Sequence, residues 1–210
     1  MKKPTKTEMR ALIKALRGLA PIQPLTYGQS LHFSRMQAAH VRRWADAITP
    51  DINLSWLVRQ RAIPVNFVAS YKLREASGLT TNHIGGRLEM FINASEPDVR
   101  QRFSLLHEFK HALDFDDAPI LHSQLGRGDK QRQADMIEWI ANDFAAHVLM
   151  PTALVKREWF KWQDLATVAS LFNVSTEAMG FRLDKLGLTG EPKRSSRMYF
   201  RSTGTLPVAA

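Results

Sequence analysis

Apolar side chains recur at every third or fourth position over most of the chain, which is the spacing of amphipathic helices. The clearest example begins at residues 95–98 (SEPD), a typical helix start, and continues with Phe103, Leu106, Phe109 and Leu113 on one side. The same spacing predicts further helices over residues 7–19, 28–47, 54–57 and 131–149, and two short helices within 162–188 that are interrupted at 173–175. A mostly helical protein is therefore expected.

Two segments have a different pattern, typical of β-strands. Residues 63–71 (IPVNFVASY) and 87–93 (RLEMFIN) are rich in β-branched and aromatic side chains. They are predicted to pair as a small antiparallel sheet, whereas residues 116–130, which contain one proline and two glycines, are predicted to form a loop. The expected fold class is α+β.

The composition allows a sizeable core and excludes several kinds of site. Of the 210 residues, 44% are hydrophobic, which is enough for one domain or for one domain with small additions. Because there is no cysteine, disulfides, thiolate ligands and a cysteine nucleophile are excluded, and a metal would have to be bound by His, Asp or Glu. Lys14 and Arg17 interrupt the apolar stretch near the N-terminus, and no window of about 18 residues is uninterruptedly apolar. We therefore expect a cytoplasmic protein with no membrane partner.

The formal net charge of +9 is concentrated at the two ends of the chain. Residues 1–20 carry six basic and one acidic side chain, and residues 187–210 carry four basic and one acidic, whereas the part between them is nearly neutral. A basic surface would favour nucleic-acid binding, but basic ends that extend into solvent explain the charge without such a partner. Direct nucleic-acid binding therefore stays open and is not favoured.

The chemistry of the chain is indicated by His107-Glu108-Phe109-Lys110-His111, an H-E-x-x-H motif within the helix predicted after residue 95. Residues four apart share a helical face, so both imidazoles can reach one metal ion. Glu108 is expected to face the water at the open coordination position and to act as the general base. The alternative is a pair of solvent-exposed histidines, which is disfavoured because the apolar side chains of this helix leave little of it for solvent.

A catalytic zinc site usually has a third protein ligand. The downstream residues that can supply it are Asp114, Asp116, Asp117, His122, Asp135, Glu138, Asp143 and His147. Glu138 is the best candidate because its helix carries three alanines between residues 141 and 146, and small side chains allow a neighbouring helix to approach closely. On spacing alone, a glutamate in an ordinary salt bridge is equally compatible.

Three stretches of the chain resemble the ImmA/IrrE family of metallopeptidases. Residues 102–111 (RFSLLHEFKH) are similar to the family's zinc helix, residues 138–151 (EWIANDFAAHVLMP) to the helix whose first residue is the third ligand, and residues 165–188 to its C-terminal helical pair. With the predicted strand at 87–93, the resemblance covers roughly residues 60–188.

The resemblance implies that His107, His111 and Glu138 bind zinc, or manganese, and that Glu108 is the general base of peptide-bond hydrolysis. It also implies that the substrate is a helix-turn-helix transcription repressor, whose cleavage would release transcription. Lys110 stands where many members of the family have glycine, and we expect its side chain to point outward.

The implied architecture is a zincin-like metallopeptidase core over residues 61–160. It is preceded by a helical segment over residues 1–60 and followed by a helix-turn-helix-like pair over 161–188 and a basic tail over 189–210.

Two details of this interpretation have alternatives. Asp114, one turn past His111, is expected either to orient a ligand imidazole or, preferably, to be a surface acid near the helix end. The second helix of the C-terminal pair offers Arg182 and Lys185 for reading DNA, but it also carries acidic residues. Packing of this helix against the core is therefore favoured.

Two other functional classes are compatible with the sequence. One is a DNA-binding regulator whose peptidase site is vestigial, and the other is a metal-bearing interaction protein, such as one half of a toxin–antitoxin pair. Glu108 argues against both, because a site that only binds has no need of a general base.

Overall fold

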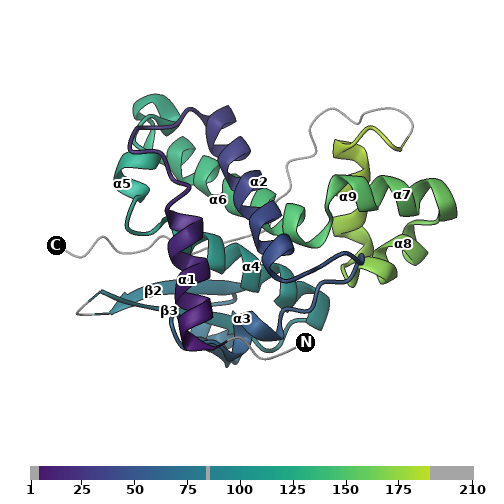
Figure 1. The fold of residues 1–210 in the computed structure, drawn as a ribbon, viewed down its shortest axis with the longest axis horizontal. Helices are drawn as coiled ribbons and strands as arrows, with labels where there is room; N and C mark the ends of the chain where they lie inside the picture. The colour runs from purple at the N-terminus through teal and green to yellow at the C-terminus, as the bar shows by residue number, and fades with distance from the viewer. Residues whose placement is uncertain (1–4, 84–85, 190–210) are drawn as a thin grey trace.

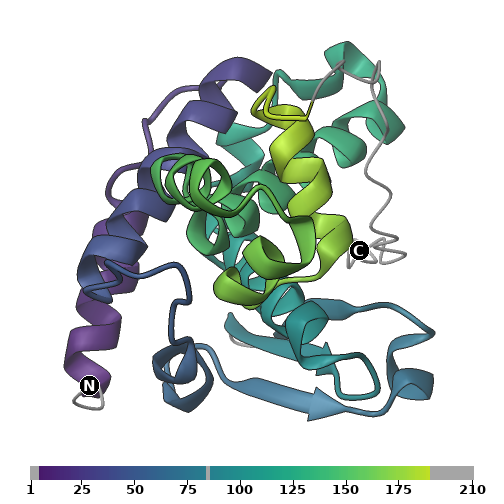
Figure 2. The same cartoon turned by 90° about the vertical axis from the view of Figure 1, so that its right-hand side faces the viewer.

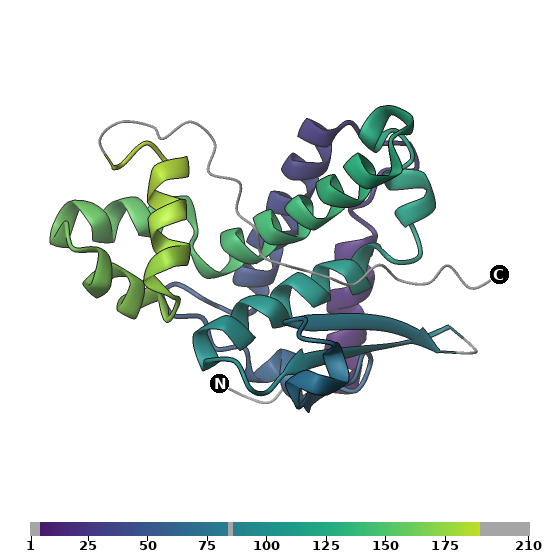
Figure 3. The same cartoon turned by 180° about the vertical axis from the view of Figure 1, so that it is seen from behind.

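The structure is a computed structural model that describes residues 5–83 and 86–189, so the predicted basic tail beyond residue 189 lies outside the described part. The elements in chain order are α1 (Lys6–Arg17), α2 (Tyr27–Trp44), α3 (Ser55–Arg59), β1 (Val65–Val68), η1 (Ser70–Leu73), β2 (Gly78–His83), β3 (Arg87–Asn93), α4 (Asp98–Asp114), α5 (Ala118–Leu121), η2 (Leu125–Gly128), α6 (Lys130–Leu149), α7 (Thr152–Trp162), α8 (Leu165–Phe172) and α9 (Thr176–Lys185). The sheet lies on one side of the molecule with α4 along it, and α7, α8 and α9 form a group at the far end of α6 (Figures 1 and 3). The mostly helical α+β class predicted from the sequence is confirmed.

The sheet has three strands in the order β1-β3-β2. The central strand β3 pairs in parallel with β1, where Val65 is opposite Met90, and antiparallel with β2, where Thr80 is opposite Met90. The predicted antiparallel pairing of the segments at 63–71 and 87–93 is therefore wrong. The reason is that β2, which the sequence analysis did not predict, forms a hairpin with β3 and occupies the antiparallel position, so β1 joins the opposite edge of β3 (Figure 2).

The first two helices begin at capping boxes. The hydroxyl of Thr5 accepts from the backbone N–H of Glu8, whose carboxylate accepts from the N–H of Thr5, and Thr26 and Gln29 repeat this arrangement at α2. Each box satisfies two donors that a helix start would otherwise leave unpaired. The two helices pack on the rest of the core, α1 against α4 and α2 against α6.

The packing of α6 between α2 and α4 is what brings its side chains to the H-E-x-x-H helix. Phe109 of α4 and Phe144 of α6 are both fully buried, with ring centroids 6.3 Å apart. On the other side of α6, the hydroxyl of Ser34 donates to the main-chain carbonyl of Ile140 at 3.2 Å, which requires a close approach of α2. The second half of α6 therefore lies next to α4, as the alanine-rich sequence predicts.

The C-terminal helical pair, α8 and α9, packs onto the preceding helices, and α7 before it is a helix that the sequence analysis did not predict. Arg182 of α9 is 3% exposed, and its Nε donates to the carbonyl of Met150 at 3.0 Å. Lys185 of the same helix forms an ion pair with Asp143, at 2.7 Å. Packing of this pair against the core is confirmed, and the burial of Arg182 removes it from any surface that could contact DNA.

Lys110 is buried, so the expectation that it points outward is wrong. Its side chain is 1% exposed, its Nζ donates to Gln37 at 2.7 Å and to Asp114 at 2.6 Å, and the Phe33 ring centroid is 4.7 Å away. Burial lowers the pKa of Lys110, and the carboxylate of Asp114 opposes that effect.

Asp114 is buried too, because α2 covers this side of α4, and its second oxygen lies 3.4 Å from Nε2 of His122. The preferred prediction that Asp114 is a surface acid is therefore wrong. Its contacts with Lys110 and His122 do not involve the imidazole of His107 or His111.

Removing the charge of Lys110 is expected to destabilise the fold. Lys110→Ala leaves the carboxylate of Asp114 buried without its cation, a change that costs about 3–5 kcal/mol in comparable buried pairs. Urea denaturation measures the difference. The matched control is Arg87→Ala, which removes a 66% exposed partner of Glu89, whose carboxylate also pairs with His83, and it should cost less than about 1 kcal/mol. Equal effects of the two substitutions would contradict a structural role for Lys110.

Candidate metal centre

Two histidines of α4 face the same point. His107 and His111 are one helical turn apart, and their Nε2 atoms lie 3.0 Å from each other. The side chain of His107 is 7% exposed and that of His111 is 23% exposed. Two ring nitrogens at this distance require a shared proton or a common cation between them.

Glu138 of α6 completes the group. Its Oε2 lies 3.1 Å from Nε2 of His107, and its Oε1 lies 3.4 Å from Nε2 of His111. Two ligand atoms of a tetrahedral ion with bonds of 2.0–2.1 Å are about 3.3 Å apart, so all three separations suit one ion. In addition, Oε2 is buried and accepts no hydrogen bond from the described residues, which leaves room for a cation. The three side chains are therefore positioned to bind one metal ion.

The orientation of His107 is set by Asn142, which lies one turn after Glu138 on α6. The amide oxygen of Asn142 is 2.9 Å from Nδ1 of His107 and accepts a hydrogen bond from this N–H. With Nδ1 protonated, Nε2 keeps the lone pair that a metal ligand needs. A single helix, α6, thus supplies both the carboxylate of this group and the hydrogen bond that holds one imidazole.

Without a cation, the group holds a proton. Burial by itself lowers the pKa of His111, but the hydrogen bond and negative charge of Glu138 outweigh burial and raise it to about 9. Conversely, burial raises the pKa of Glu138, and the nearness of His107 and His111 outweighs it and holds that pKa well below its ordinary range. A divalent cation would replace this proton and take over the charge balance of the site.

Glu108 lies beside this group and faces the edge strand β2. The hydroxyl of Thr80 is 2.8 Å from Oε2 of Glu108 and 3.0 Å from its main-chain oxygen. A Cβ at Gly78 would come within 2.8 Å of Cγ of Glu108, so only glycine leaves space for this carboxylate. These three residues line one cavity of about 190 Å³ together with His111 and Glu138. The carboxylate of Glu108 thus shares a cavity with two members of the group that is positioned to bind a metal.

Among the described residues, the other acids and histidines considered as a third ligand are not part of the group formed by His107, His111 and Glu138. Asp143, on the same helix as Glu138, pairs with His147 at 3.2 Å and with Arg35 at 2.9 Å. The pair with Asp143 gives His147 a structural role, which the sequence did not indicate. His122 lines the same cavity as Glu108, but its Nε2 faces Asp114.

Three residues of the site were missed from the sequence, namely Gly78, Thr80 and Asn142. The two on β2 had no signal because the strand itself was not predicted. Asn142 had one usable signal, since it follows Glu138 by four residues and therefore shares its helical face.

Asn142→Ala is expected to weaken metal binding without abolishing it. The substitution removes the acceptor that keeps His107 in the right tautomer, and loss of such a partner typically reduces metal affinity about 10- to 100-fold. Competition with a chromophoric chelator measures the affinity. Asn173→Ala, at the end of α8, is a matched control that should leave the affinity unchanged, and an unchanged affinity in Asn142→Ala would mean that this hydrogen bond has no role in metal binding.

Gly78→Ala is expected to reduce catalysis while the metal stays bound. The added methyl group would displace Glu108 and not the ligands, and a misplacement of about 1 Å can cost about 10²-fold in rate. Zinc content and peptide cleavage are measured on the same sample. Gly28→Ala, where nothing lies within 4 Å of the added atom, is the control. Equal activity of the two variants would show that the fit of Glu108 against β2 is unimportant.

Two histidines on α4 and a glutamate on α6 that are positioned to bind one metal ion, with the carboxylate of Glu108 beside them, are the arrangement of a metallopeptidase-type domain. The comparison of sequences agrees with this class. The chain belongs to the peptidase M78 family, described as IrrE N-terminal-like domain, whose sequence model matches residues 67–184.

Among solved structures, a Mycobacterium tuberculosis transcriptional regulator has a similar fold, with a TM-score of 0.59 and 17% sequence identity. The match covers 82% of this chain and 51% of the other, so this chain spans about half the length of that protein. At this identity the likeness shows the fold alone. None of the curated proteins compared with the chain matches it. Over the described residues, every helix is too short or too polar to cross a membrane.

Proposed function

We propose that this chain is a zinc-dependent endopeptidase that cleaves a specific transcription repressor. The observation that carries the proposal is the position of Glu108, whose carboxylate lies in the same cavity as His111 and Glu138 and accepts a hydrogen bond from the hydroxyl of Thr80. A site that only bound a metal would have no use for this carboxylate, whereas hydrolysis requires a group that accepts a proton from water.

His107, His111 and Glu138 would hold the zinc ion, and two imidazoles with one carboxylate are the ligand set of several hydrolytic zinc sites. Manganese accepts the same ligand types. When bound, the metal supplies Lewis acidity, which lowers the pKa of water to about 7 and polarises the carbonyl of the scissile bond.

In the proposed reaction, Glu108 moves one proton. Its carboxylate accepts the proton of a water molecule as the water oxygen forms a bond to the peptide carbonyl carbon. The carboxylic acid then gives this proton to the amine nitrogen as the carbon–nitrogen bond breaks. Thr80 donates to Oε2 and keeps the carboxylate directed along the cavity.

The position of β2 supports a peptide as the substrate. In the order β1-β3-β2, this strand is at the edge of the sheet, and within the described structure it pairs with β3 alone. An extended peptide can add to such an edge through main-chain hydrogen bonds. Because Gly78 and Thr80 of the same strand contact Glu108, a peptide paired with β2 would run past the general base.

The choice of a repressor rests on the resemblance to the ImmA/IrrE family, and the similar fold of a protein described as a transcriptional regulator is in keeping with it. A repressor substrate would place the reaction in the cytoplasm.

The alternative of a DNA-binding protein has less support, because Arg182, one of the two cations of α9 considered for DNA contact, is buried. No described contact favours the toxin–antitoxin alternative.

The test is incubation of the zinc-loaded protein with the helix-turn-helix repressor encoded beside its gene, in parallel with manganese-loaded protein. We expect one discrete cut in the repressor and none in casein. Digestion of casein with the repressor left whole would remove the regulatory part of the proposal and keep the peptidase part. If neither protein is cut, the enzymatic proposal itself fails.

A further inference from the structure

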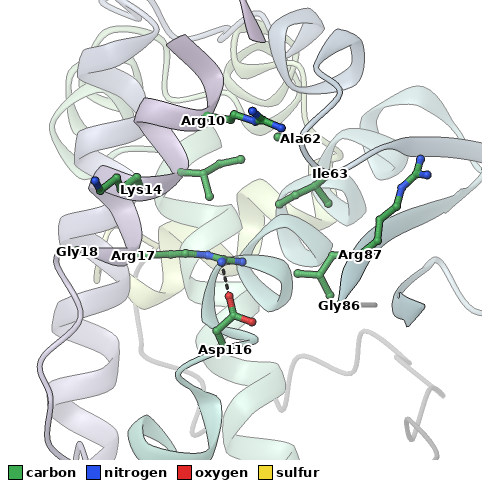
Figure 4. Close-up of a pocket in the computed structure, with 11 residues that line it drawn as sticks. Arg10, Lys14, Arg17, Gly18, Ala62, Ile63, Gly86, Arg87 and Asp116 are labelled. Atoms are coloured by element: carbon green, nitrogen blue, oxygen red, sulfur yellow. Dashed lines mark hydrogen bonds and ion pairs between the residues drawn. The ribbon is translucent and has the colours of Figure 1, made fainter. Parts of the chain in front are cut away.

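A second cavity, of about 550 Å³, lies between α1 and the start of β3 (Figure 4). It shares no lining residue with the cavity at Glu108. Arg10, Arg17 and Arg87 surround it, and Ile63 and Leu88 form part of its apolar lining. The cavity therefore combines cationic groups with a buried apolar surface, and the proposed peptide hydrolysis uses none of these residues.

The cations come from two separate elements. Arg10 and Arg17 are seven residues apart on α1, which places them on one face two turns apart. Figure 4 shows both guanidinium groups extending from α1 toward the segment at Ile63, while the ammonium of Lys14 points away, and Arg87 lies across the cavity. Asp116 is the one acid among the described lining residues, and it pairs with Arg17. The cavity thus has a net positive charge.

The arginines are only partly satisfied. The Nε of Arg17 is buried and has no acceptor among the described residues, although its Nη atoms bind Asp116 and the carbonyl of Ala112. Arg87 is 66% exposed, and its ion pair with Glu89, at 3.3 Å, is of the weak surface kind. Arg87 therefore keeps guanidinium donors at the cavity that an oxygen-rich anion can accept from.

The lining indicates what kind of anion fits. A guanidinium matches the oxygens of phosphate in a two-pronged geometry, and the apolar surface beside it suits a ring or hydrocarbon part. The volume lies in the range of small-molecule sites. None of the large apolar side chains exposed on the described structure lines the cavity, so the apolar anchors typical of a protein-docking surface are absent there. We propose that this cavity binds a small phosphorylated molecule with an apolar or aromatic part, such as a nucleoside monophosphate.

The first experiment compares AMP with inorganic phosphate by titration calorimetry on the zinc-loaded protein. We expect AMP to bind at least about tenfold more tightly than phosphate, because its base would cover the apolar lining in addition to the contacts of the phosphate. Equal affinities would show that the cavity binds the phosphate group alone, and would overturn the proposal that the ligand has an apolar or aromatic part.

The second experiment locates the binding. Arg10→Glu and, independently, Arg87→Glu should each weaken AMP binding more than about tenfold, because each replaces an attractive charge with a repulsive one. Arg43→Glu is the matched control, since Arg43 is exposed on α2 and away from the cavity, and it should leave the affinity unchanged. Arg17 is left intact because its bond to the carbonyl of Ala112 supports the end of α4.

Three results would overturn the proposal. The first is that AMP does not bind. The second is that Arg10→Glu and Arg87→Glu bind AMP as well as the wild type does, which would place AMP outside this cavity. The third is that a single-stranded oligonucleotide binds and AMP does not. All of these are binding measurements, so their outcome is independent of whether the protein cleaves a repressor.

Discussion

Replacing Glu108 with glutamine should abolish peptide cleavage and leave the bound metal in place. Glutamine has nearly the same size, and its amide oxygen can still accept the hydrogen bond from Thr80, which is 2.8 Å from Oε2 in the structure. It cannot accept a proton from water. Removal of general-base catalysis typically costs about 10²- to 10⁴-fold in rate, and here it would be the sole change made to the site.

The measurement pairs two quantities on one sample, the zinc content and the rate of repressor cleavage. Glu138→Ala is the contrasting variant, because it should lose both metal and cleavage. If Glu108→Gln loses as much zinc as Glu138→Ala, the roles given to the two carboxylates are wrong. If it keeps full activity, the proton is accepted by another group, and His122 in the same cavity would be the first to test.

Removing a metal ligand is expected to have the second large effect. Wild-type protein should bind about one zinc ion per chain, and His107→Ala, His111→Ala or Glu138→Ala should each lower the affinity by more than the roughly 10- to 100-fold expected for Asn142→Ala. A three-residue site that loses one ligand keeps two, which is too few to hold zinc against a chelator.

His147→Ala is the matched control for these variants. It removes a histidine from α6, the helix of Glu138, but His147 pairs with Asp143 and is not part of the metal-binding group. It should therefore leave zinc binding unchanged. A wild-type protein that is folded and takes up no zinc or manganese would exclude the metal site altogether.

The elements that the sequence predicted well are those whose pattern is local. The helices α2, α4 and α6 were predicted within a few residues of their ends, because their apolar positions follow the helical period over four or more turns. The strand β2 was missed because its sequence, GLTTNH, contains a single large apolar residue. Its place in the sheet comes from pairing with β3, which no local pattern reveals, and the direction of β1 could not be predicted without it.

The burial of Lys110 shows a similar limit. Position 110 lies between the two histidines, and from the sequence alone a lysine on a helix points to solvent. Its actual surroundings come from Gln37 and Phe33, which lie more than 70 residues earlier. Only the packing of α2 on this side of α4 makes the position a buried one.

What the sequence by itself determined is the part of the site that lies within one turn of one helix. Four-residue spacing places His107 and His111 on the same face wherever the helix forms, and Glu108 follows from the same geometry. The tertiary structure decided the rest. Glu138 reaches the imidazoles because α6 packs on α4, and Glu108 has its place because Gly78 and Thr80 of an edge strand lie against it. The physical reason is that helical spacing depends on the backbone alone, whereas contacts between elements depend on side chains far apart in the sequence that pack only in the folded chain.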